Sequence, residues 1–395
     1  MKKYKVLIVH NYYKIPGGED AVVENEKNML KENGHEVIMY TKHNNEVDSS
    51  KKINLFFKTI FSLRTFREVK KIIKREKIDL VHVHNTLPII SPAIYYSAFS
   101  TKTPVVQTIH NFRLICPAAT LTLNGKICEK CINRGLHNSL INKCYRNSLM
   151  QTFTVYVMLK LHRFIGTYKK INGYIALTEF NKNKLMNLIK DEEKIHIKPN
   201  FIKSNIAYEK RIPDNYFVFI GRLDKLKGTN ILVETFKNIT NTKLYIIGDG
   251  PERAELKEKI IKNKITSIEI LGYMERDKAF KILKKAKALI IPSQWYEGFP
   301  MTVVEAFSFG VPVIASNLGN LSSIIINNEN GLLFKHDDYN DLIKRIQIIL
   351  ENEELNDYLS NNAFETYENL YNDEINYKQL IDIYRKIKGD MNGSM

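Results

Sequence analysis

Two glutamates eight residues apart, Glu297 and Glu305, are the first side chains in this sequence whose type and spacing suggest chemistry. Eight residues are a little over two helical turns, so both carboxylates can face the same side. Glu297 stands in a loop that follows the apolar run Ala288–Ile291, and Glu305 lies in the predicted helix after it, Met301–Phe309. A loop at a helix N-terminus favours phosphate, whereas a carboxylate repels phosphate and accepts hydrogen bonds from hydroxyl groups. A ligand with both phosphate and hydroxyl groups is a sugar nucleotide. Two glutamates at this spacing also occur by chance on solvated helices.

A second loop carries two cations in similar surroundings. Its sequence, G-R-L-D-x-x-K-G, begins at Gly221 and includes Arg222 and Lys227. A predicted strand at Phe217–Ile220 and a predicted helix at Thr229–Phe236 place both cations at a helix N-terminus that favours anions. Arginine can bind two oxygens at once, and lysine supplies a mobile point charge. The loop therefore predicts a diphosphate site.

The first half of the chain has its own candidates at strand ends. Gly17 and Gly18 follow the predicted strand Val6–Val9, and glycine lets a backbone approach a ligand closely. His110 ends another predicted strand, Val105–His110. A glycine pair is often only a turn and such a histidine is often structural, but parallel α/β sheets bind ligands at the carboxyl ends of their strands. Both positions are therefore candidates for a binding site.

All four cysteines of the chain lie in one short segment, at Cys116, Cys128, Cys131 and Cys144. The C-x2-C pair with two further thiols nearby can supply the four ligands of a structural zinc site. A usual zinc site has two such close pairs, so unpaired thiols or redox pairing are equal alternatives. Stable disulfides are not expected in a cytoplasmic protein. We assign these cysteines no catalytic role.

Short apolar runs alternate with amphipathic segments along the chain, which predicts two doubly wound parallel sheets of the α/β class. The pattern stops near residue 200 and then restarts. We therefore place a first domain at residues 1–200, with the cysteines in an insertion at 111–148, a second domain at 201–372, and a last helix within 373–395. Inside the first domain we expect a loop at His10–Gly18, one continuous helix at Phe56–Lys77 and a long apolar helix at Leu149–Phe164.

Three strings in the chain resemble motifs of one enzyme family. Y-E-G-F-P-M-x-x-x-E-A-x-x-x-G-x-P-V-I-A, from Tyr296 to Ala315, resembles the donor-site signature of family 4 glycosyltransferases, which have the two-domain GT-B fold. G-R-L-D-x-x-K-G is similar to a second motif, and H-N-F-R-L-I-C-P resembles a subset with a four-cysteine insertion in the N-terminal domain. The resemblance covers nearly the whole chain. It implies two Rossmann-like domains facing a central cleft, an acceptor side in the first, a donor side in the second, and a last helix packing back on the first.

The resemblance also implies an activity and the residues for it. A hexosyl or related group would pass from a UDP- or GDP-sugar to an acceptor with retention of the anomeric configuration. The implied catalytic residues are His110 beside the transferred sugar, Arg222 and Lys227 on the diphosphate, and Glu297 on the sugar hydroxyls. Glu305 would bind the ribose. The implied donor-binding residues are Gly17, Gly18, Gly221, Tyr273, Gly298, Phe299, Pro300, Met301 and Glu305.

No metal ion or other cofactor is expected in catalysis. No Asp in the chain is followed two positions later by another Asp, so the D-x-D metal motif of the other main glycosyltransferase fold is missing. Arg222, Lys227 and helix N-termini would instead neutralise the departing diphosphate. Two other classes stay open at this point. They are a sugar-nucleotide epimerase of the same two-domain plan, and a non-catalytic binder of nucleotide sugars or nucleic acid.

The charge of the chain is concentrated in its first half. Residues 1–200 hold 33 Lys and Arg against 16 Asp and Glu, whereas the remainder holds 26 against 27. The segment Lys51–Lys77 alone has ten basic residues, interleaved with Phe56, Phe57 and Phe61. This pattern suits an anionic membrane surface, and a solvated helix face fits it equally well. We expect a lipid-linked saccharide acceptor of cell-surface polysaccharide synthesis and no nucleic-acid partner.

The length and composition fit a globular protein of two domains. The chain has 395 residues, 44% of them hydrophobic and 26% charged. No apolar run is long enough to cross a membrane, and the apolar part of the N-terminus is too short for a signal peptide. We therefore expect a cytoplasmic protein that associates peripherally with the inner face of the cell membrane.

Overall fold

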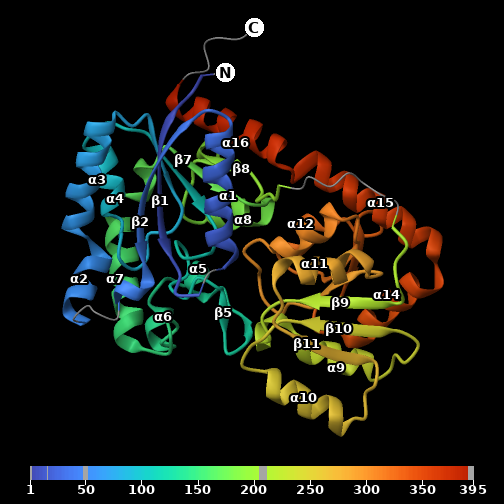
Figure 1. Cartoon of the computed structure of the whole chain (residues 1–395). Helices are drawn as coiled ribbons and strands as arrows, with labels where there is room; N and C mark the ends of the chain where they lie inside the picture. Colours follow the sequence, from blue (N-terminus) through green and yellow to red (C-terminus); the bar gives the residue numbers. More distant parts are fainter. Residues whose placement is uncertain (1, 16, 48–51, 204–210, 390–395) are drawn as a thin grey trace. The chain divides into compact units, whose positions relative to one another are not determined.

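The computed structural model describes residues 2–15, 17–47, 52–203 and 211–389, which fall into two compact units (Figure 1). The first unit comprises Met1–Leu123, Cys128–Asn200 and Asp373–Met395. The second comprises Asn124–Ile127 and Phe201–Asn372. The polar boundary expected after residue 200 lies partly at 204–210, outside the described residues, and so does Lys51 at the start of the basic segment.

A six-stranded parallel sheet forms the centre of the first unit, in the order β2-β1-β3-β4-β7-β8. All four residues of the apolar run Val6–Val9 in β1 are fully buried, because helices cover both faces of the sheet. The strands are β1 (Lys5–Tyr12), β2 (Glu36–His43), β3 (Leu80–Val83), β4 (Val105–Ile109), β7 (Gly173–Ala176) and β8 (Ile195–Ile197).

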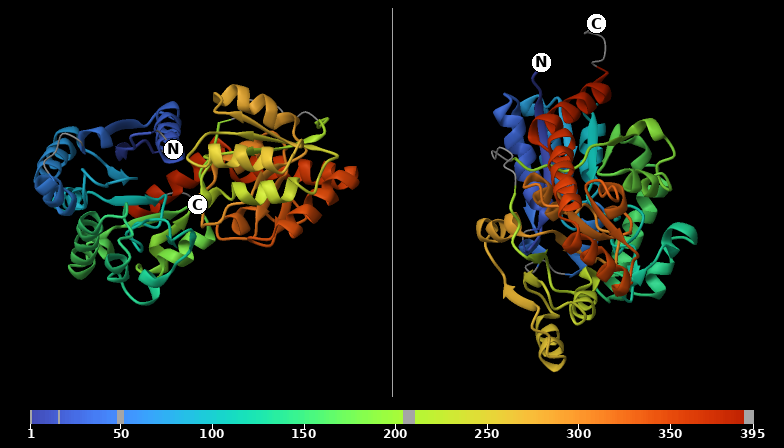
Figure 2. Two further views of the ribbon diagram at one scale, coloured as in Figure 1. Left: turned by 90° about the horizontal axis from the view of Figure 1, so that it is seen from below. Right: turned by 90° about the vertical axis from the view of Figure 1, so that its right-hand side faces the viewer.

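Helices α3, α4 and α7 cover one face of this sheet, and their apolar side chains share a core with Leu7 and Val9. On the other face, α1 lies beside α16, the last helix of the chain (Figures 1 and 2). The helices of the unit are α1 (Gly18–Glu32), α2 (Lys52–Ile60), α3 (Leu63–Glu76), α4 (Ala93–Phe99), α5 (Lys130–Asn133), α6 (Asn138–Ile141), α7 (Leu149–Phe164), α8 (Glu179–Leu185) and α16 (Asp373–Lys388).

Two of the expected elements in the first unit are wrong. The continuous helix at Phe56–Lys77 is broken into α2 and α3, because the Ser62 hydroxyl accepts from the amide of Thr65 at 3.2 Å and starts a new helix. The loop expected from His10 begins later. Strand β1 continues to Tyr12, since its last residues pair in parallel with β2.

The cysteine-containing insertion is a short irregular segment between β4 and α7. It holds the two-stranded hairpin β5 (Thr122–Leu123) and β6 (Lys126–Ile127), followed by α5 and α6. Helix α7 then runs over the residues expected for it, with the Ser148 hydroxyl accepting from the amide of Gln151 at its start. Within the described part of the chain, no helix combines the length and the apolar character needed to cross a bilayer.

The second unit is also a six-stranded parallel sheet, ordered β11-β10-β9-β12-β13-β14. This order reverses direction between β9 and β12, and ligands of doubly wound sheets bind at the carboxyl ends of strands at such a switch point. The strands are β9 (Tyr216–Ile220), β10 (Lys243–Ile247), β11 (Ile268–Gly272), β12 (Leu289–Ile291), β13 (Val313–Ser316) and β14 (Gly331–Phe334).

Two separate apolar cores fill the second unit, one with Phe307 of α12 and one with Phe236 of α9. Helix α9 occupies the range expected from the sequence, whereas α13 and β14 were not anticipated. The helices are α9 (Thr229–Phe236), α10 (Arg253–Lys262), α11 (Arg276–Lys285), α12 (Met301–Ser308), α13 (Leu321–Ile324), α14 (Tyr339–Glu351) and α15 (Glu353–Leu370).

Candidate functional site

The two loops singled out in the sequence meet at the switch point of the second unit. Strands β9 and β12 are neighbours, and the loop after each strand leads into a helix, α9 or α12. The backbone amide of Gln294 in the second loop donates to the carbonyl of Leu226 in the first at 2.7 Å. The residues of both motifs are thereby held in one compact group.

Gly228 allows this close approach. It adopts φ +73°, and a Cβ atom at this position would lie 1.9 Å from the carbonyl oxygen of Pro292. No side chain fits there without moving the backbone of the neighbouring loop. The final glycine of G-R-L-D-x-x-K-G is therefore required by the packing of one strand-end loop against the other.

Lys227 and Glu297 form an ion pair at the centre of this group. The Lys227 Nζ lies 2.8 Å from Glu297 Oε1, and the Ser293 hydroxyl donates to the same oxygen at 2.5 Å. Glu297 is 4% exposed, whereas Lys227 keeps part of its side chain at the surface. A buried carboxylate with a lysine beside it suits a ligand that offers hydroxyl groups to the first and negative charge to the second.

Asn320 fixes the backbone beside Glu297, and no motif in the sequence predicted this residue. This buried residue follows β13, and its side-chain amide donates to the carbonyl oxygens of Glu297 and of Gly298, the latter at 2.8 Å. It therefore holds the loop in one conformation. The only available signal was an asparagine shortly after a strand next to β12.

Arg222 is more exposed than Lys227 and lies at the edge of the same loop. Its Nε is 3.5 Å from Asp224 Oδ2, and 66% of its side chain is exposed. Asp224 in turn accepts from the amides of Leu226 and Lys227, which shapes the turn between β9 and α9. The arginine is thus tethered at one end and available to solvent at the other.

Glu305 has a different cation from Glu297. Arg276 at the start of α11 donates to Glu305 Oε1 at 2.9 Å, and this arginine was not anticipated either. Burial raises the pKa of Glu305, and the positive charge of Arg276 opposes that rise. The two carboxylates of the spacing motif are therefore paired with separate cations, Lys227 and Arg276.

The remaining donor-binding candidates of the second unit differ in exposure. Phe299 and Met301 are partly buried against the core, and Pro300 is the N-cap residue of α12. Tyr273 follows β11 and is 78% exposed, so its ring is free to meet a planar ligand. A Cβ atom at Gly221 would lie 3.2 Å from the ring of Phe219.

His110 of the first unit follows β4 and is hydrogen-bonded to another histidine. Its Nε2 lies 2.9 Å from Nδ1 of His84, and the two rings stack. Burial, assisted by the nearby His10, lowers the pKa of His110 to about 3, so the imidazole is neutral at physiological pH. His110 lines a cavity of about 40 Å³ together with Glu19 and Arg113.

Gly17 and Gly18 form the N-terminus of α1, beside β1. Gly17 is the N-cap residue, and its amide donates to Asp20 Oδ2 at 3.0 Å. A Cβ atom at Gly17 would meet nothing within 4 Å, so the position is open. The other carboxylate oxygen of Asp20 lies 2.7 Å from Nε2 of His10.

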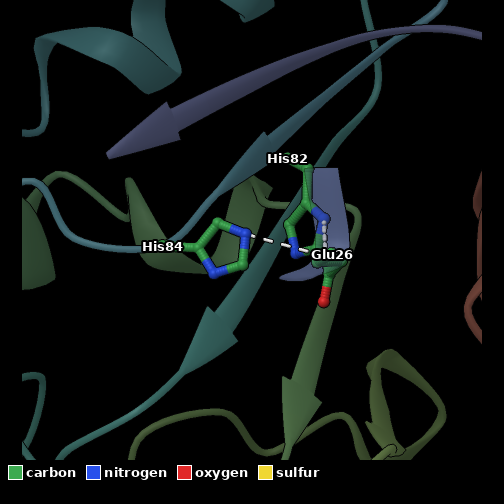
Figure 3. A group of neighbouring side chains, drawn as sticks. All are labelled: Glu26, His82 and His84. Carbon is green, nitrogen blue, oxygen red and sulfur yellow. Dashed lines mark ion pairs between the residues drawn. The ribbon is translucent and has the colours of Figure 1, made fainter. Parts of the chain in front are cut away.

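A buried group of Glu26, His82 and His84 lies inside the first unit, and no motif in the sequence predicted it. Figure 3 shows His84, His82 and the Glu26 carboxylate next to one another, with Nδ1 of His82 2.9 Å from Oε1. The ligand atoms are close enough together to hold a metal ion. However, Lys198 Nζ lies 3.2 Å from the other oxygen of Glu26 and supplies the positive charge that a metal would bring.

Both ring nitrogens of His82 also have hydrogen-bonding partners already, at 2.8 Å. Nδ1 contacts the hydroxyl of Tyr384 in α16, and Nε2 contacts the hydroxyl of Thr108 in β4. Burial opposes ionisation of Glu26, but Lys198 and His82 hold its pKa well below the usual range. The group is therefore a buried ionic network that attaches α16 to the sheet, rather than a metal centre.

The four cysteines are all free thiols, and they lie near one another. Burial and the other three sulfurs raise the pKa of Cys131 to about 12, and similar causes raise that of Cys144 to about 11. Four thiols fit zinc by ligand type and number. Among the described residues, however, only Glu26, His82 and His84 form a group with ligand atoms within 4.8 Å of one another. The sulfurs would therefore have to move together to bind zinc.

Two family models match consecutive parts of this chain. Residues 16–205 match the model described as Glycosyltransferase Family 4, and residues 202–366 match the model described as Glycosyl transferases group 1. An uncharacterized glycosyltransferase of Methanocaldococcus jannaschii is 28% identical over 373 residues, which cover 91% of this chain and 92% of that protein. An N-acetyl-D-galactosaminyltransferase of Campylobacter jejuni, whose name specifies a saccharide on PP-undecaprenol, is 33% identical over 43% of this chain and 48% of its own.

Solved structures with the same fold cover nearly the whole chain. A glycosyltransferase from Rickettsia africae has a TM-score of 0.70 at 20% identity and covers 100% of both chains. The protein HepE from Anabaena, in complex with UDP-glucose, has a TM-score of 0.66 at 14% identity and covers 96% of this chain and 99% of its own. These likenesses, with the two parallel sheets, confirm the expected GT-B fold.

Proposed function

We infer that this chain, a GT-B glycosyltransferase like those of family 4, moves a sugar from a nucleotide diphosphate to a saccharide acceptor. The observation that carries this inference is the Lys227–Glu297 pair at the switch point of the second sheet. It combines a cation for phosphate with a buried acceptor for hydroxyl groups. Solved structures of the same fold include one with bound UDP-glucose, which supports a UDP-sugar as donor, and a GDP-sugar is the other candidate.

In this proposal the cations of the second unit stabilise the leaving diphosphate. Lys227 and Arg222 lie in one loop before α9, so their charges are in position before the bond breaks. A bound diphosphate competes with Glu297 for Lys227, which leaves the Glu297 carboxylate to accept from the sugar hydroxyls. Glu305 accepts from the ribose hydroxyls while Arg276 balances its charge. The transfer retains the anomeric configuration, as the family resemblance implies.

His110 acts as a neutral hydrogen-bonding group in the first unit. Its pKa of about 3 keeps the imidazole uncharged over the working pH range, so it can bind a sugar hydroxyl without attracting the diphosphate. Its hydrogen bond with His84 fixes the orientation of the ring. The N-terminus of α1 at Gly17 and Gly18 is open and favours an anion.

The acceptor in this proposal is a lipid-linked saccharide used in cell-surface polysaccharide synthesis, at the inner face of the cell membrane. Two observations support it. The Campylobacter jejuni relative is named for a saccharide on PP-undecaprenol. The basic excess lies in residues 1–200, whereas the proposed donor loops lie after residue 200, so the donor loops do not account for it.

A donor panel tests the proposed function directly. The thermal unfolding midpoint of the whole chain should rise with one class of nucleotide sugar among UDP-, GDP-, ADP- and TDP-sugars. In Lys227→Ala that rise should shrink, whereas Lys225→Ala, which changes an exposed neighbour, should behave like the wild type. No shift with any donor contradicts the proposal. Conversion of the donor sugar in the absence of acceptor would indicate an epimerase instead.

We also propose a structural zinc ion on the four cysteines. The thiolates would repel one another, and this repulsion contributes to the raised pKa values of Cys131 and Cys144. A zinc ion would remove the repulsion, so the raised pKa values are compatible with a zinc site. Metal analysis of the purified chain should find about one zinc per molecule, lost in Cys128→Ser with Cys131→Ser. A metal-free wild-type protein of unchanged stability would contradict the zinc site.

A further inference from the structure

Helices α2 and α7 pack side by side in the first unit and expose an unusual amount of apolar surface (Figure 1). Among the described residues, ten of the eighteen exposed large apolar side chains lie on or beside these two helices. They include Phe57 at 63% exposed, Phe153 at 45% and Phe164 at 88%. The others are Ile53, Leu63, Ile141, Leu149, Met150, Leu161 and Ile165. A gathering of exposed apolar side chains on two neighbouring helices is typical of a binding site.

Helix α7 is apolar on two opposite faces. Val155 and Leu159 point into the core of the first unit, as in any helix that covers a sheet. The exposed side chains Phe153, Leu161 and Phe164 recur at the spacing of a second stripe along the outside of the helix. One face is thus explained by the fold, and the other needs an apolar partner.

A groove between α2 and α7 adds depth to this surface. It has a volume of about 640 Å³, and Leu55 and Phe56 of α2 form one wall while Met150 and Val155 of α7 form the other. The rings of Phe56 and Phe153 stack at its edge, with centroids 6.2 Å apart. Arg146, Ser148 and Gln151 also line it. The volume is in the range of small-molecule sites, and a chain of methylene groups suits the apolar walls.

The neighbouring helix α3 carries the charge. Five basic residues line a shallow surface depression on it, beside Phe66: Arg67, Lys70, Lys71, Lys74 and Arg75. The basic segment recognised in the sequence is therefore divided in two. Helix α2 carries mostly apolar groups, and α3 carries most of the cations. A surface with both features side by side is typical of proteins that bind anionic lipid.

We propose that the α2–α7 face inserts into an anionic bilayer, with one lipid chain in the groove between the helices and the cations of α3 on the headgroups. A second copy of this chain is disfavoured as the partner, because it would bring two strongly basic surfaces together. The proposal rests on the membrane association described above, and it does not depend on the transfer reaction.

The first experiment measures co-sedimentation of the whole chain with phosphatidylcholine vesicles that contain increasing phosphatidylglycerol. Binding should rise with phosphatidylglycerol and fall at high salt, because surface charges are screened beyond about 8–10 Å. Phe57→Ser or Phe164→Ser should weaken binding by about tenfold or more, as expected for losing one buried aromatic side chain. The control Tyr358→Ser changes another exposed aromatic residue, in α15 of the second unit, and should bind like the wild type. Equal binding by all variants overturns the proposal.

The second experiment places a probe at the groove. The chain has one tryptophan, Trp295, which lies in the second unit and gives a constant background. Phe153→Trp should be quenched by vesicles made with brominated lipid chains, whereas Tyr358→Trp should not. Equal quenching of both, or of neither, contradicts insertion at this face. A dimer in solution that Phe164→Ser dissociates, without vesicle binding, would assign the face to a second copy.

The two proposals fail in different ways. If the wild type binds vesicles but no nucleotide sugar shifts its unfolding midpoint, the proposed function is wrong and the membrane surface stands. If a nucleotide sugar shifts the midpoint but the wild type does not bind vesicles, the membrane surface is wrong and the proposed function stands. Phe57 and Phe164 lie outside every residue placed in the donor site, so their variants should keep the wild-type response to nucleotide sugar.

Discussion

The charged groups of the two units differ in how deeply they are buried. In the second unit the loops beyond β9 and β12 hold Arg222 and Lys227, which remain partly exposed. In the first unit a charged network is enclosed, as with His82 in β3 and Glu26 in α1, both fully buried. In the proposed function the two exposed cations meet a ligand, whereas the buried network holds helices of the first unit to its sheet. Substitutions of similar chemistry should therefore lower activity in one unit and stability in the other.

The largest effect should come from Lys198→Met. Lys198 Nζ lies 3.2 Å from Glu26 and 2.8 Å from Asn376 Oδ1 in α16, so its removal leaves a buried carboxylate without a cation. We expect the free energy of unfolding of the first unit to fall by about 3–5 kcal/mol. Urea denaturation followed by hydrogen exchange of peptides from each unit measures this. The control Lys190→Met removes an exposed lysine, and a Lys198→Met protein as stable as this control would break the comparison.

Lys227→Ala should lower activity while leaving the stability of the first unit unchanged. Losing this cation leaves the departing diphosphate under-compensated, which should cost about 2–4 kcal/mol in the transition state, or ten- to a thousandfold in turnover. Arg222→Ala should act in the same direction. Steady-state kinetics with the donor found in the thermal-shift panel measures both, with Lys225→Ala as control. Near wild-type turnover in both variants would show that the second sheet does not present its charge to the donor.

The two units also differ in how much of their polar chemistry could be predicted from the sequence. The places of the two loops beyond β9 and β12 were predicted because their residues lie within short motifs next to apolar strands. The bounds of α7 and α9 were predicted because caps and stripes are local signals. The Glu26–Lys198 pair joins residues 172 positions apart, so no local pattern marks it. Arg276 was missed for the same reason, since its partner Glu305 is 29 positions away.

The broken helix shows the same limit. Phe56–Lys77 has continuous helical character in the sequence, yet α2 ends at Ile60 and α3 starts at Leu63. The amide of Ser62 donates to the Ser91 hydroxyl at 2.9 Å, a contact from another element that fixes the break. Long-range contacts therefore account for both the missed network and the wrong helix, whereas the fold class followed from local alternation alone.

Asn320→Ala should have a smaller effect, confined to the donor loop. Its side-chain amide donates to two backbone carbonyls, those of Glu297 and Gly298. A buried carbonyl that loses its donor without a replacement costs about 1–3 kcal/mol. We expect a weaker donor-induced thermal shift and a higher KM for the donor, with the first unit unaffected in hydrogen exchange. Asn317→Ala, in the same loop but exposed, is the matched control. If both variants bind donor like the wild type, the loop does not depend on Asn320.

Substituting a buried histidine should change stability least at neutral pH. On acidification the effect should be confined to the first unit. Nine of the ten lie in the first unit, and only His336 lies in the second. Burial lowers the pKa of His84 well below its usual range and that of His110 to about 3. The folded state therefore binds fewer protons than the unfolded state below about pH 6.5, the ordinary value for histidine. Stability is fully present above that pH and is lost as the pH falls toward about 3.

The first unit should accordingly lose protection from hydrogen exchange on acidification before the second unit does. His110→Gln removes one such group, so the decline in the free energy of unfolding of the first unit should become shallower by about 1.4 kcal/mol per pH unit in this window. At pH 7 the variant should differ from the wild type only by its hydrogen bond with His84. His336→Gln is the control in the second unit and should leave the slope of the first unit unchanged. Simultaneous loss of both units, with the same slope in both variants, would mean that the buried histidines do not distinguish the two sheets.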